Sequence, residues 1–376
     1  MANNNKHTGP NVPALRFPEF SGEWEKVKLG DSCTFFSGGT PSSSRKEYYC
    51  GDIPFIRSGE LHSDSTALSI TKEAFASCSA KMVNNGDLLL ALYGATSGDI
   101  SISRINGAIN QAILCIRPKH LNTYFIKSLW ESHKKQILET YLQGGQGNLS
   151  SEIIKNISFM FPNIEEQNKI SELVRKIDKR ISTQSKIIEE QETLLKSLAD
   201  ILFRQNNHLC PLSELVDIIK GKQLNADNLS EEGDFYVMNG GITPSGYYSE
   251  YNVPAGAISI SEGGNSCGYV QFNEEPFWSG GHCYSLRSKN TIVDYKYIYY
   301  FLKAKQADVM ALRIGSGLPN IQKKDIEKFT ISFPSVQLQK QIVKALDALS
   351  EKINTEKQFL EKYCQQKNYL LSKLFI

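Results

Sequence analysis

A loop that combines glycines, hydroxyl groups and cations spans residues 38–49. Its sequence is Gly-Gly-Thr-Pro-Ser-Ser-Ser-Arg-Lys-Glu-Tyr-Tyr. Hydroxyl and guanidinium groups suit contacts with phosphate oxygens and with guanine. A solvated surface loop would have a similar composition, so both interpretations stay open. The candidate contact residues in this loop are Thr40, Ser43, Arg45, Lys46 and Tyr48.

Other polar and aromatic side chains on turns rich in glycine and asparagine could make the same kind of contact. Asparagine pairs well with adenine, and arginine pairs with guanine or phosphate. The candidates in the N-terminal half are Arg57, Tyr93, Ser97 and Arg104. Those in the C-terminal half are Lys220, Lys222, Asn239, Tyr247, Asn265 and Arg313.

The sequence motifs of common enzymes are absent. The only Gly-Lys pair, Gly221-Lys222, lacks the upstream glycine of a P-loop and is followed by glutamine. There is no His-Glu-x-x-His, no Gly-x-Ser-x-Gly, and no Pro-Pro pair of the kind found in amino-methyltransferase active sites. The glycine pairs lack Gly-x-Gly-x-x-Gly spacing between a strand and a helix, so they indicate tight turns more than phosphate cradles. We therefore expect no catalytic residue.

The eight cysteines and six histidines show no pattern typical of a metal site or of paired disulfides. No Cys-x-x-Cys occurs, and reduced, buried thiols are the simpler interpretation. The polar N-terminus lacks the apolar region of a signal peptide, and the longest apolar run, residues 88–93, is too short to cross a bilayer. The sequence predicts a soluble, cytoplasmic protein without a metal site.

A chain of 376 residues is too long for one ordinary core and predicts two or three domains. Its net charge of +2 means that contact with a polyanion would depend on local clusters. Residues 1–162 hold 16 basic and 14 acidic side chains, whereas residues 206–334 hold 11 and 14. The second segment is net acidic, so its cations would have to lie on one face to meet a polyanion.

A fixed offset of 172 residues superimposes two long segments of the chain. Pairs that coincide at this offset are Phe161 with Phe333, Gln167 with Gln339, and Phe203 with Phe375. The chain is therefore a tandem duplication of one globular part followed by one helical part.

Apolar residues alternate in steps of three and four along both helical parts, which is the pattern of a heptad seam. Each seam is polar midway, at Gln184 and Glu356, and a helix break at these positions stays open. A helix of about 40 residues is roughly 60 Å long and must bury its seam against another helix. The expected seam residues are Ile177, Ile181, Ile188, Leu195, Leu198, Leu349, Ile353, Leu360 and Leu370.

The partner of each long helix is expected to be its duplicate in the same chain, because a linked partner has a high effective concentration. Short connections make the pair antiparallel, with one globular part at each end and a pseudo-twofold relation between the repeats. Pairing between two chains is the alternative.

Both globular parts contain short apolar stretches bounded by Gly, Asn and Ser turns and followed by a helical stretch, and both are predicted to be α+β. The predicted stretches are 87–93, 99–105, 112–116 and helix 124–141 in the first part, and 257–261, 269–272, 283–286 and helix 295–312 in the second. The expected divisions of the chain are a flexible N-terminus (1–13), globular domains (14–162 and 206–334) and long helices (163–205 and 335–376).

Several segments are distinctive in type and order. They are Leu15-Arg16-Phe17-Pro18-Glu19-Phe20-Ser21-Gly22-Glu23-Trp24, Gly86-Asp87-Leu88-Leu89, Phe161-Pro162-Asn163-Ile164-Glu165-Glu166-Gln167 and Glu275-Pro276-Phe277-Trp278. With the duplicated architecture, these segments resemble the DNA specificity subunit of type I restriction-modification systems over nearly the whole chain. The second copy departs from the pattern, because Val336-Gln337-Leu338-Gln339 lacks the acidic pair Glu165-Glu166.

The resemblance implies a reader of DNA that has no catalytic site of its own. Two target recognition domains, joined by two long antiparallel coiled-coil helices, would each read one half of a bipartite site in double-stranded DNA. The helices would dock two methyltransferase (M) subunits, and restriction (R) subunits would join the complex. S-adenosylmethionine, ATP and Mg are expected only on those partner subunits, and no membrane partner is expected.

Two other functions are compatible with the sequence. A coiled-coil adaptor that joins two protein-binding domains is the main alternative, and an enzyme that acts alone on DNA is the third. An adaptor would select no bipartite sequence from randomised duplexes. Binding of S-adenosylmethionine by the purified chain would favour the enzyme.

Overall fold

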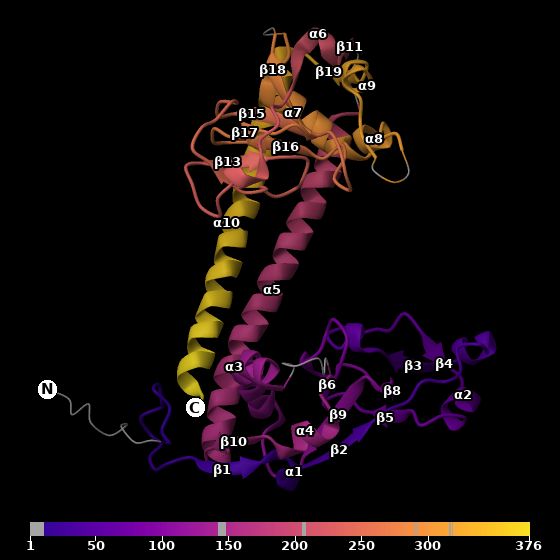
Figure 1. Cartoon of the computed structure of the whole chain (residues 1–376), viewed down its shortest axis with the longest axis vertical. Helices are drawn as coiled ribbons and strands as arrows, with labels where there is room; N and C mark the ends of the chain where they lie inside the picture. Colours follow the sequence, from indigo (N-terminus) through magenta and orange to yellow (C-terminus); the bar gives the residue numbers. More distant parts are fainter. Residues whose placement is uncertain (1–10, 142–147, 205–207, 290–291, 316, 318) are drawn as a thin grey trace, which may run out of the picture. The chain divides into compact units, whose positions relative to one another are not determined.

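The two long helices run without interruption in the computed structural model, which describes residues 11–141, 148–204, 208–289, 292–315, 317 and 319–376. Helix α5 spans Ile164–Leu202 and helix α10 spans Val336–Leu374, each 39 residues long (Figure 1). Both continue through the polar seam positions Gln184 and Glu356, so no break occurs there. None of the nine expected seam residues is exposed.

Two compact units divide the chain, and each contains one globular part and one portion of each long helix. The first unit is Met1–Gln184 with Phe359–Ile376, and the second is Ser185–Gln358. The domain divisions expected at residues 162, 205 and 334 stay predictions. Most of the expected flexible segment 1–13 lies outside the described residues.

Ion pairs within each unit give the direction of the helices. In the first unit Lys367 of α10 pairs with Asp178 of α5 at 2.7 Å, and in the second Lys357 pairs with Glu192 at 2.6 Å. Residue numbers rise along α5 as they fall along α10. The helices are therefore antiparallel, as the argument from short connections predicted.

The first globular part consists of two four-stranded sheets and a two-stranded pair. The sheet orders are β2-β9-β6-β7 and β4-β3-β8-β5, and β1 pairs with β10. Strand β6 (Leu88–Ala91) lies inside its sheet and is buried throughout, which explains its uninterrupted apolar sequence. The other strands are β1 (Glu25–Lys28), β2 (Cys33–Ser37), β3 (Ile53–Ile56), β4 (Ser69–Ile70), β5 (Lys81–Val83), β7 (Ile100–Ile102), β8 (Gly107–Ile109), β9 (Ile113–Pro118) and β10 (Ser158–Phe161). The helices are α1 (Leu29–Ser32), α2 (Lys72–Ala76), α3 (Thr123–Tyr141) and α4 (Ser151–Asn156), with 3-10 turns at Lys46–Tyr49 and Ser58–Glu60.

The second globular part repeats this topology except that its second sheet has three strands instead of four. Its sheets have the orders β12-β18-β15-β16 and β14-β13-β17, and β11 pairs with β19. The parallel pair β13-β17 corresponds to the parallel pair β3-β8 of the first part. The strands are β11 (His208–Pro211), β12 (Val216–Lys220), β13 (Phe235–Met238), β14 (Tyr247–Tyr248), β15 (Ala257–Ser261), β16 (Val270–Asn273), β17 (Trp278–Ser279), β18 (Cys283–Ser288) and β19 (Thr330–Phe333). The helices are α6 (Leu212–Leu215), α7 (Tyr295–Ala304), α8 (Gln306–Ala311) and α9 (Lys323–Glu327), with a 3-10 turn at Ala226–Asn228.

The predicted α+β class and tandem repeat are confirmed, but one predicted helix is divided. The sequence favours a single helix over 295–312, whereas α7 ends at Ala304 and α8 begins at Gln306. Lys305 between them leaves helical geometry, with φ −92° and ψ 19°. None of the described helices has an apolar stretch long enough to cross a membrane.

The last residues after each long helix contribute to a globular core. Phe203, which follows α5, lies 5.3 Å from Tyr297 of α7 in the second unit, measured between ring centroids. Phe375, which follows α10, lies 5.2 Å from Phe125 of α3 in the first unit. These two pairs are related by the offset of 172 residues. Each helix therefore begins in the core of one unit and ends in the core of the other.

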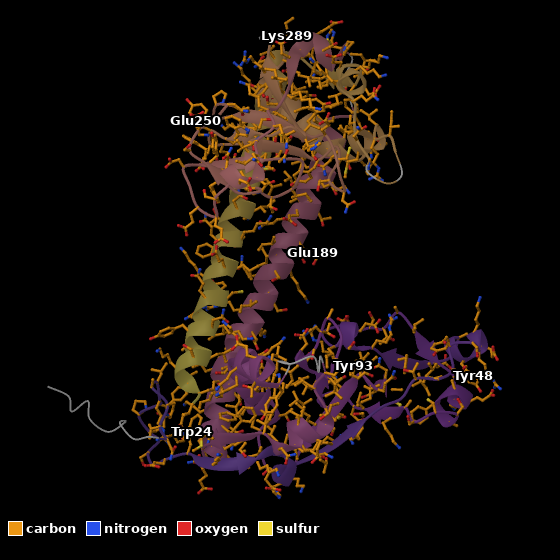
Figure 2. The ribbon with its side chains drawn as sticks, in the orientation of Figure 1. Trp24, Tyr48, Tyr93, Glu189, Glu250 and Lys289 are labelled. Atoms are coloured by element: carbon orange, nitrogen blue, oxygen red, sulfur yellow. The ribbon has the colours of Figure 1, made fainter. Side chains whose placement is uncertain are left out.

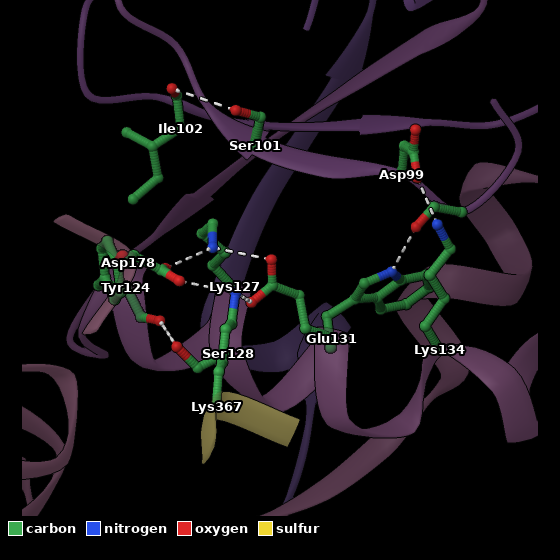
Figure 3. Close-up of polar contacts among 12 residues, drawn as sticks. Asp99, Ser101, Ile102, Tyr124, Lys127, Ser128, Glu131, Lys134, Asp178 and Lys367 are labelled. Carbon is green, nitrogen blue, oxygen red and sulfur yellow. Dashed lines mark hydrogen bonds and ion pairs between the residues drawn. The ribbon is translucent and has the colours of Figure 1, made fainter. Parts of the chain in front are cut away.

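A network of charges joins α3, α5 and α10 in the first unit (Figure 3). Lys367 pairs with Asp178 at 2.7 Å and with Glu131 at 3.2 Å. Lys127 pairs with the same two carboxylates, at 3.3 and 2.8 Å, and the hydroxyl of Tyr124 donates to Asp178. The residues at the corresponding positions of the second unit are Leu195, Ser350, Lys303, Tyr299 and Lys296. This set of charges is therefore not repeated in the second unit, where Lys296 of α7 pairs instead with Asp347 of α10 at 2.9 Å.

Candidate nucleic-acid interface

Each unit places its Gly-rich loops together at one end of the strands of a four-stranded sheet. This sheet is β2-β9-β6-β7 in the first unit and β12-β18-β15-β16 in the second, and we call this end of it the loop edge. In the first unit the backbone N–H of Leu92 donates to the carbonyl of Ala112 at 2.8 Å. In the second unit the N–H of Glu262 donates to the carbonyl of His282 at 2.9 Å. The loop edge includes residues 38–45, 92–99 and 110–112 in the first unit and 221–225, 262–269 and 280–282 in the second.

The first glycine of each loop edge is required by close packing of the backbone. A Cβ atom on Gly38 would lie 1.7 Å from the carbonyl oxygen of Ile109, and one on Gly221 would lie 2.1 Å from that of Gly280. Any larger residue would force the backbones apart. These glycines therefore fix how the loops leave strands β2 and β12, and a role as phosphate cradle is not needed to explain them.

The loop of residues 38–49 is only partly available for contact with a ligand. Thr40 hydrogen-bonds Gln111 through its side chain, and Ser43 and Lys46 are exposed. Arg45 donates to the hydroxyl of Tyr48 at 2.5 Å, yet its side chain keeps 55% of its surface exposed. Exposed cations next to hydroxyls remain compatible with a phosphate contact.

Tyr48 requires a correction. Its side chain is only 6% exposed and packs in a core cluster with Phe55 and Ile70. A buried ring cannot stack on a base or lie along a phosphate backbone. Tyr48 instead supports Arg45, whose guanidinium lies 5.1 Å from the ring centroid. Tyr48 and Tyr93 are well separated in the first globular part (Figure 2).

The secondary candidates of the first unit do not share one face. Tyr93 is half-buried and Ser97 donates to the carbonyl of Leu92 at 3.1 Å, so both belong to the loop edge. Arg57 directly follows β3 and pairs with Glu60 at 3.1 Å. Arg104 is exposed but follows Ile102, which pairs with Leu88 at the opposite end of the β6-β7 hairpin. Arg104 is therefore separated from Tyr93 by the length of that hairpin.

Candidates of the second unit converge more closely. Lys220, at the end of β12, pairs with Glu262 at 2.7 Å, and the side-chain oxygen of Asn239 accepts from the N–H of His282 at 3.1 Å. Lys222 and Asn265 are exposed in the adjacent loops. Arg313 is exposed after α8, and Tyr247 is half-buried in β14.

Two residues at the loop edge escaped the sequence prediction, Glu262 and His282. Both lie next to glycine pairs, but an acid or a histidine before or after glycine is too common to single out. Their proximity depends on the pairing of β15 with β18, which the sequence does not state. Among the described residues, no group of three histidine, cysteine or acidic side chains could hold a metal ion.

The comparison with known families matches two segments, residues 21–193 and 207–362, to the type I restriction modification DNA specificity domain. The matched segments cover both repeats and most of the chain. The chain belongs to this family. Glu166, half of the acidic pair present only in the first copy, is buried and pairs with Arg16 at 2.7 Å, so it anchors the N-terminal segment of the specificity chain.

Known type I specificity subunits are similar to this chain, some over nearly its whole length and others over less than half of it. The MjaVIII type I specificity subunit of Methanocaldococcus jannaschii is 23% identical and covers 93% of this chain and 91% of its own. A Mycoplasma pneumoniae chain named as a type I specificity subunit is 30% identical over 166 residues, 44% of each chain, so the match spans less than half of that relative. The crystal structure of a type I S subunit from Mycoplasma genitalium has a TM-score of 0.68 at 21% identity, covering 97% of this chain and 99% of that one. This structural similarity supports the fold.

Proposed function

We propose that this chain is the non-catalytic DNA-recognition and scaffolding subunit of a type I restriction-modification complex. Each loop edge reads one half of a bipartite site in double-stranded DNA. The long helices dock two methyltransferase subunits, and restriction subunits join them. The complex works in the cytoplasm, and S-adenosylmethionine, ATP and Mg bind to the partners.

The observation that carries this proposal is the duplication of the loop edge with different residues in each copy. The two loop edges share backbone hydrogen bonds but differ in side chains, for example Leu92 against Glu262 and Ala112 against His282. Two readers with the same scaffold and different chemistry suit a site made of two different half-sequences.

Exposed apolar residues on the long helices support the docking role. Leu194 and Ile201 of α5 are 56% and 62% exposed, and Phe359 and Tyr369 of α10 are 45% and 60% exposed. Leu194 and Ile201 are seven residues apart and therefore share one face of α5, against which a helix of a partner can pack.

The test is to map methylated adenines in the host with and without this gene, and then after a domain exchange. Replacing residues 30–145 by the matching part of a relative should change one half-site and leave the other half-site and the spacing unchanged. A change in both half-sites together would contradict two independent readers. If no bipartite sequence depends on the gene, and randomised duplexes yield none, the adaptor function would replace this proposal.

A further inference from the structure

A buried carboxylate lies at the centre of the second loop edge. Glu262 is 8% exposed, and its Oε1 accepts hydrogen bonds from Lys220 at 2.7 Å and from the hydroxyl of Tyr284 at 2.8 Å. Its Oε2 is also buried and accepts no hydrogen bond from any described residue. Nδ1 of the His282 ring lies 3.6 Å from Oε2. Burying a charge in this way is costly, so it calls for a reason.

The fold itself does not need this carboxylate, as the first repeat shows. Leu92 occupies the corresponding position, is 6% exposed, and makes the same backbone contacts. The N–H of Leu149 donates to the carbonyl of Leu92 at 2.8 Å, and that of Ile321 donates to the carbonyl of Glu262 at 2.9 Å. An apolar side chain therefore completes this part of the scaffold, and the charge at Glu262 serves another purpose.

The neighbours of this position change together between the repeats. The strand registers of the two units align residue by residue. In this alignment Lys220 replaces Ser37 and Glu262 replaces Leu92. His282 replaces Ala112, and Tyr284 replaces Leu114. An apolar group with one hydroxyl is thus replaced by a cation, an anion and two further polar side chains. The second unit has a polar cluster where the first has ordinary core.

The two outer members of this cluster are open to solvent. The side chain of Lys220 is 55% exposed and that of His282 is 62% exposed, whereas that of Glu262 is 10% exposed. The ammonium group has three N–H donors, and Glu262 accepts one of them. The carboxylate thus fixes the direction of a lysine whose remaining donors face the surface of the loop edge.

We infer that Lys220 reads a guanine in the half-site of the second unit and that Glu262 is the positioning residue that orients it. This inference rests on the proposed function. Lysine donates to O6 and N7 of guanine in the major groove. A phosphate contact needs only a free cation, and pairing with Glu262 weakens the net charge of Lys220 while keeping its directed N–H groups. The pairing therefore suits base recognition better than attraction to the backbone.

The test uses the complex purified from its host and a pool of duplexes randomised over both half-sites, selected by mobility shift and sequenced. Lys220→Met keeps the apolar stem and removes the donors. It should lower the preference for one G·C pair in the second half-site by about tenfold or more and leave the first half-site unchanged. Lys289→Ala is the charge-matched control, because Lys289 follows the far end of β18 and pairs with Asp217.

Variants of Glu262 separate positioning from folding. Glu262→Leu introduces the residue of the first repeat, so the melting temperature should be unchanged or higher, while the preference for the same G·C pair falls as in Lys220→Met. Glu262→Gln keeps an acceptor for Lys220 and should retain more of that preference. A merely structural role would alter melting without altering the base preference.

The outcomes are distinguishable. An unchanged base preference in Lys220→Met would overturn the inference. Equal weakening of all sequences, with a smaller dependence of binding on salt, would assign Lys220 to a phosphate and overturn it as well. If the unaltered complex selects no bipartite sequence, the proposed function fails first and the inference fails with it.

Discussion

Gln167 and Gln339 occupy the same position in the two repeats and make the same two hydrogen bonds. The side-chain oxygen of Gln167 accepts from the N–H of Asn122 at 3.0 Å, and that of Gln339 accepts from the N–H of Asp294 at 2.7 Å. Their amide groups donate to the carbonyls of Pro162 and Pro334, both at 2.8 Å. Asn122 and Asp294 in turn accept hydrogen bonds from the first turns of α3 and α7. Each glutamine therefore fixes the start of a long helix to the start of a globular helix.

Gln339→Leu should lower the free energy of unfolding by about 2 kcal/mol or more. Gln339 is fully buried, and the substitution leaves the N–H of Asp294 and the carbonyl of Pro334 without their partner. Urea unfolding followed by circular dichroism measures the change. Gln341→Leu, at an exposed position of the same helix, is the control and should have little effect. Equal stability of the two variants would contradict this role.

Gly38→Ala should destabilise the first unit by about 3 kcal/mol, because the new Cβ meets the carbonyl of Ile109 and the backbone must move. Gly59→Ala provides the matched control, since nothing lies within 4 Å of the Cβ position there. Thermal unfolding of both variants measures the difference. Similar melting temperatures would show that the backbones at Gly38 and Ile109 can move apart at little cost in stability.

The charge network predicts a loss of stability in acid. Burial alone would raise the pKa of Asp178, but Lys127 and hydrogen bonds from Lys367 and Tyr124 hold it below its ordinary value of 3.8. The stabilisation is therefore complete above about pH 4 and is lost as the pH falls through the lowered pKa. Asp178→Asn should cost about 2 kcal/mol at pH 7 and should flatten this acid dependence. Melting temperatures between pH 3 and 7 test this, with Glu189→Gln, at an exposed position of α5, as control.

Lys303 predicts a gain of stability at alkaline pH. Burial lowers the pKa of this lysine from 10.5 to about 8. The folded chain therefore releases this proton at a lower pH than the unfolded chain, and stability should rise between pH 8 and pH 10.5. The gain is about 3 kcal/mol and should be absent in Lys303→Met. A parallel pH profile for both proteins would show that the ammonium group carries no penalty in the fold.

The sequence predicted the repeat, the long helices and the strands with long apolar runs, because heptad spacing and uninterrupted apolar residues can be recognised from the order of the residues alone. It did not indicate strands such as β1, whose residues Glu25–Lys28 are mostly polar and exposed. The end of α7 at Ala304 carries no proline or glycine signal. At the candidate site, residue type selected several loops that lie together at the loop edges, and their contact with DNA stays a prediction. The sequence did not show that Tyr48 is buried or that Lys220 and Glu262 lie together. Both facts depend on the pairing of strands that are far apart in the sequence.

The ion network of the first unit includes Lys367, near the end of α10, and so contributes to the packing of that chain end in the first core. A fragment ending at residue 204 would lack a core for Phe203 and could exchange helix ends with a second fragment, because Phe203 and Phe375 fill equivalent places. In such a dimer Leu195 would replace Lys367 opposite Asp178, removing one of the cations of the network. The network therefore favours self-recognition within one chain over assembly from halves. Leu195→Lys should tighten the fragment dimer on the order of tenfold in sedimentation experiments.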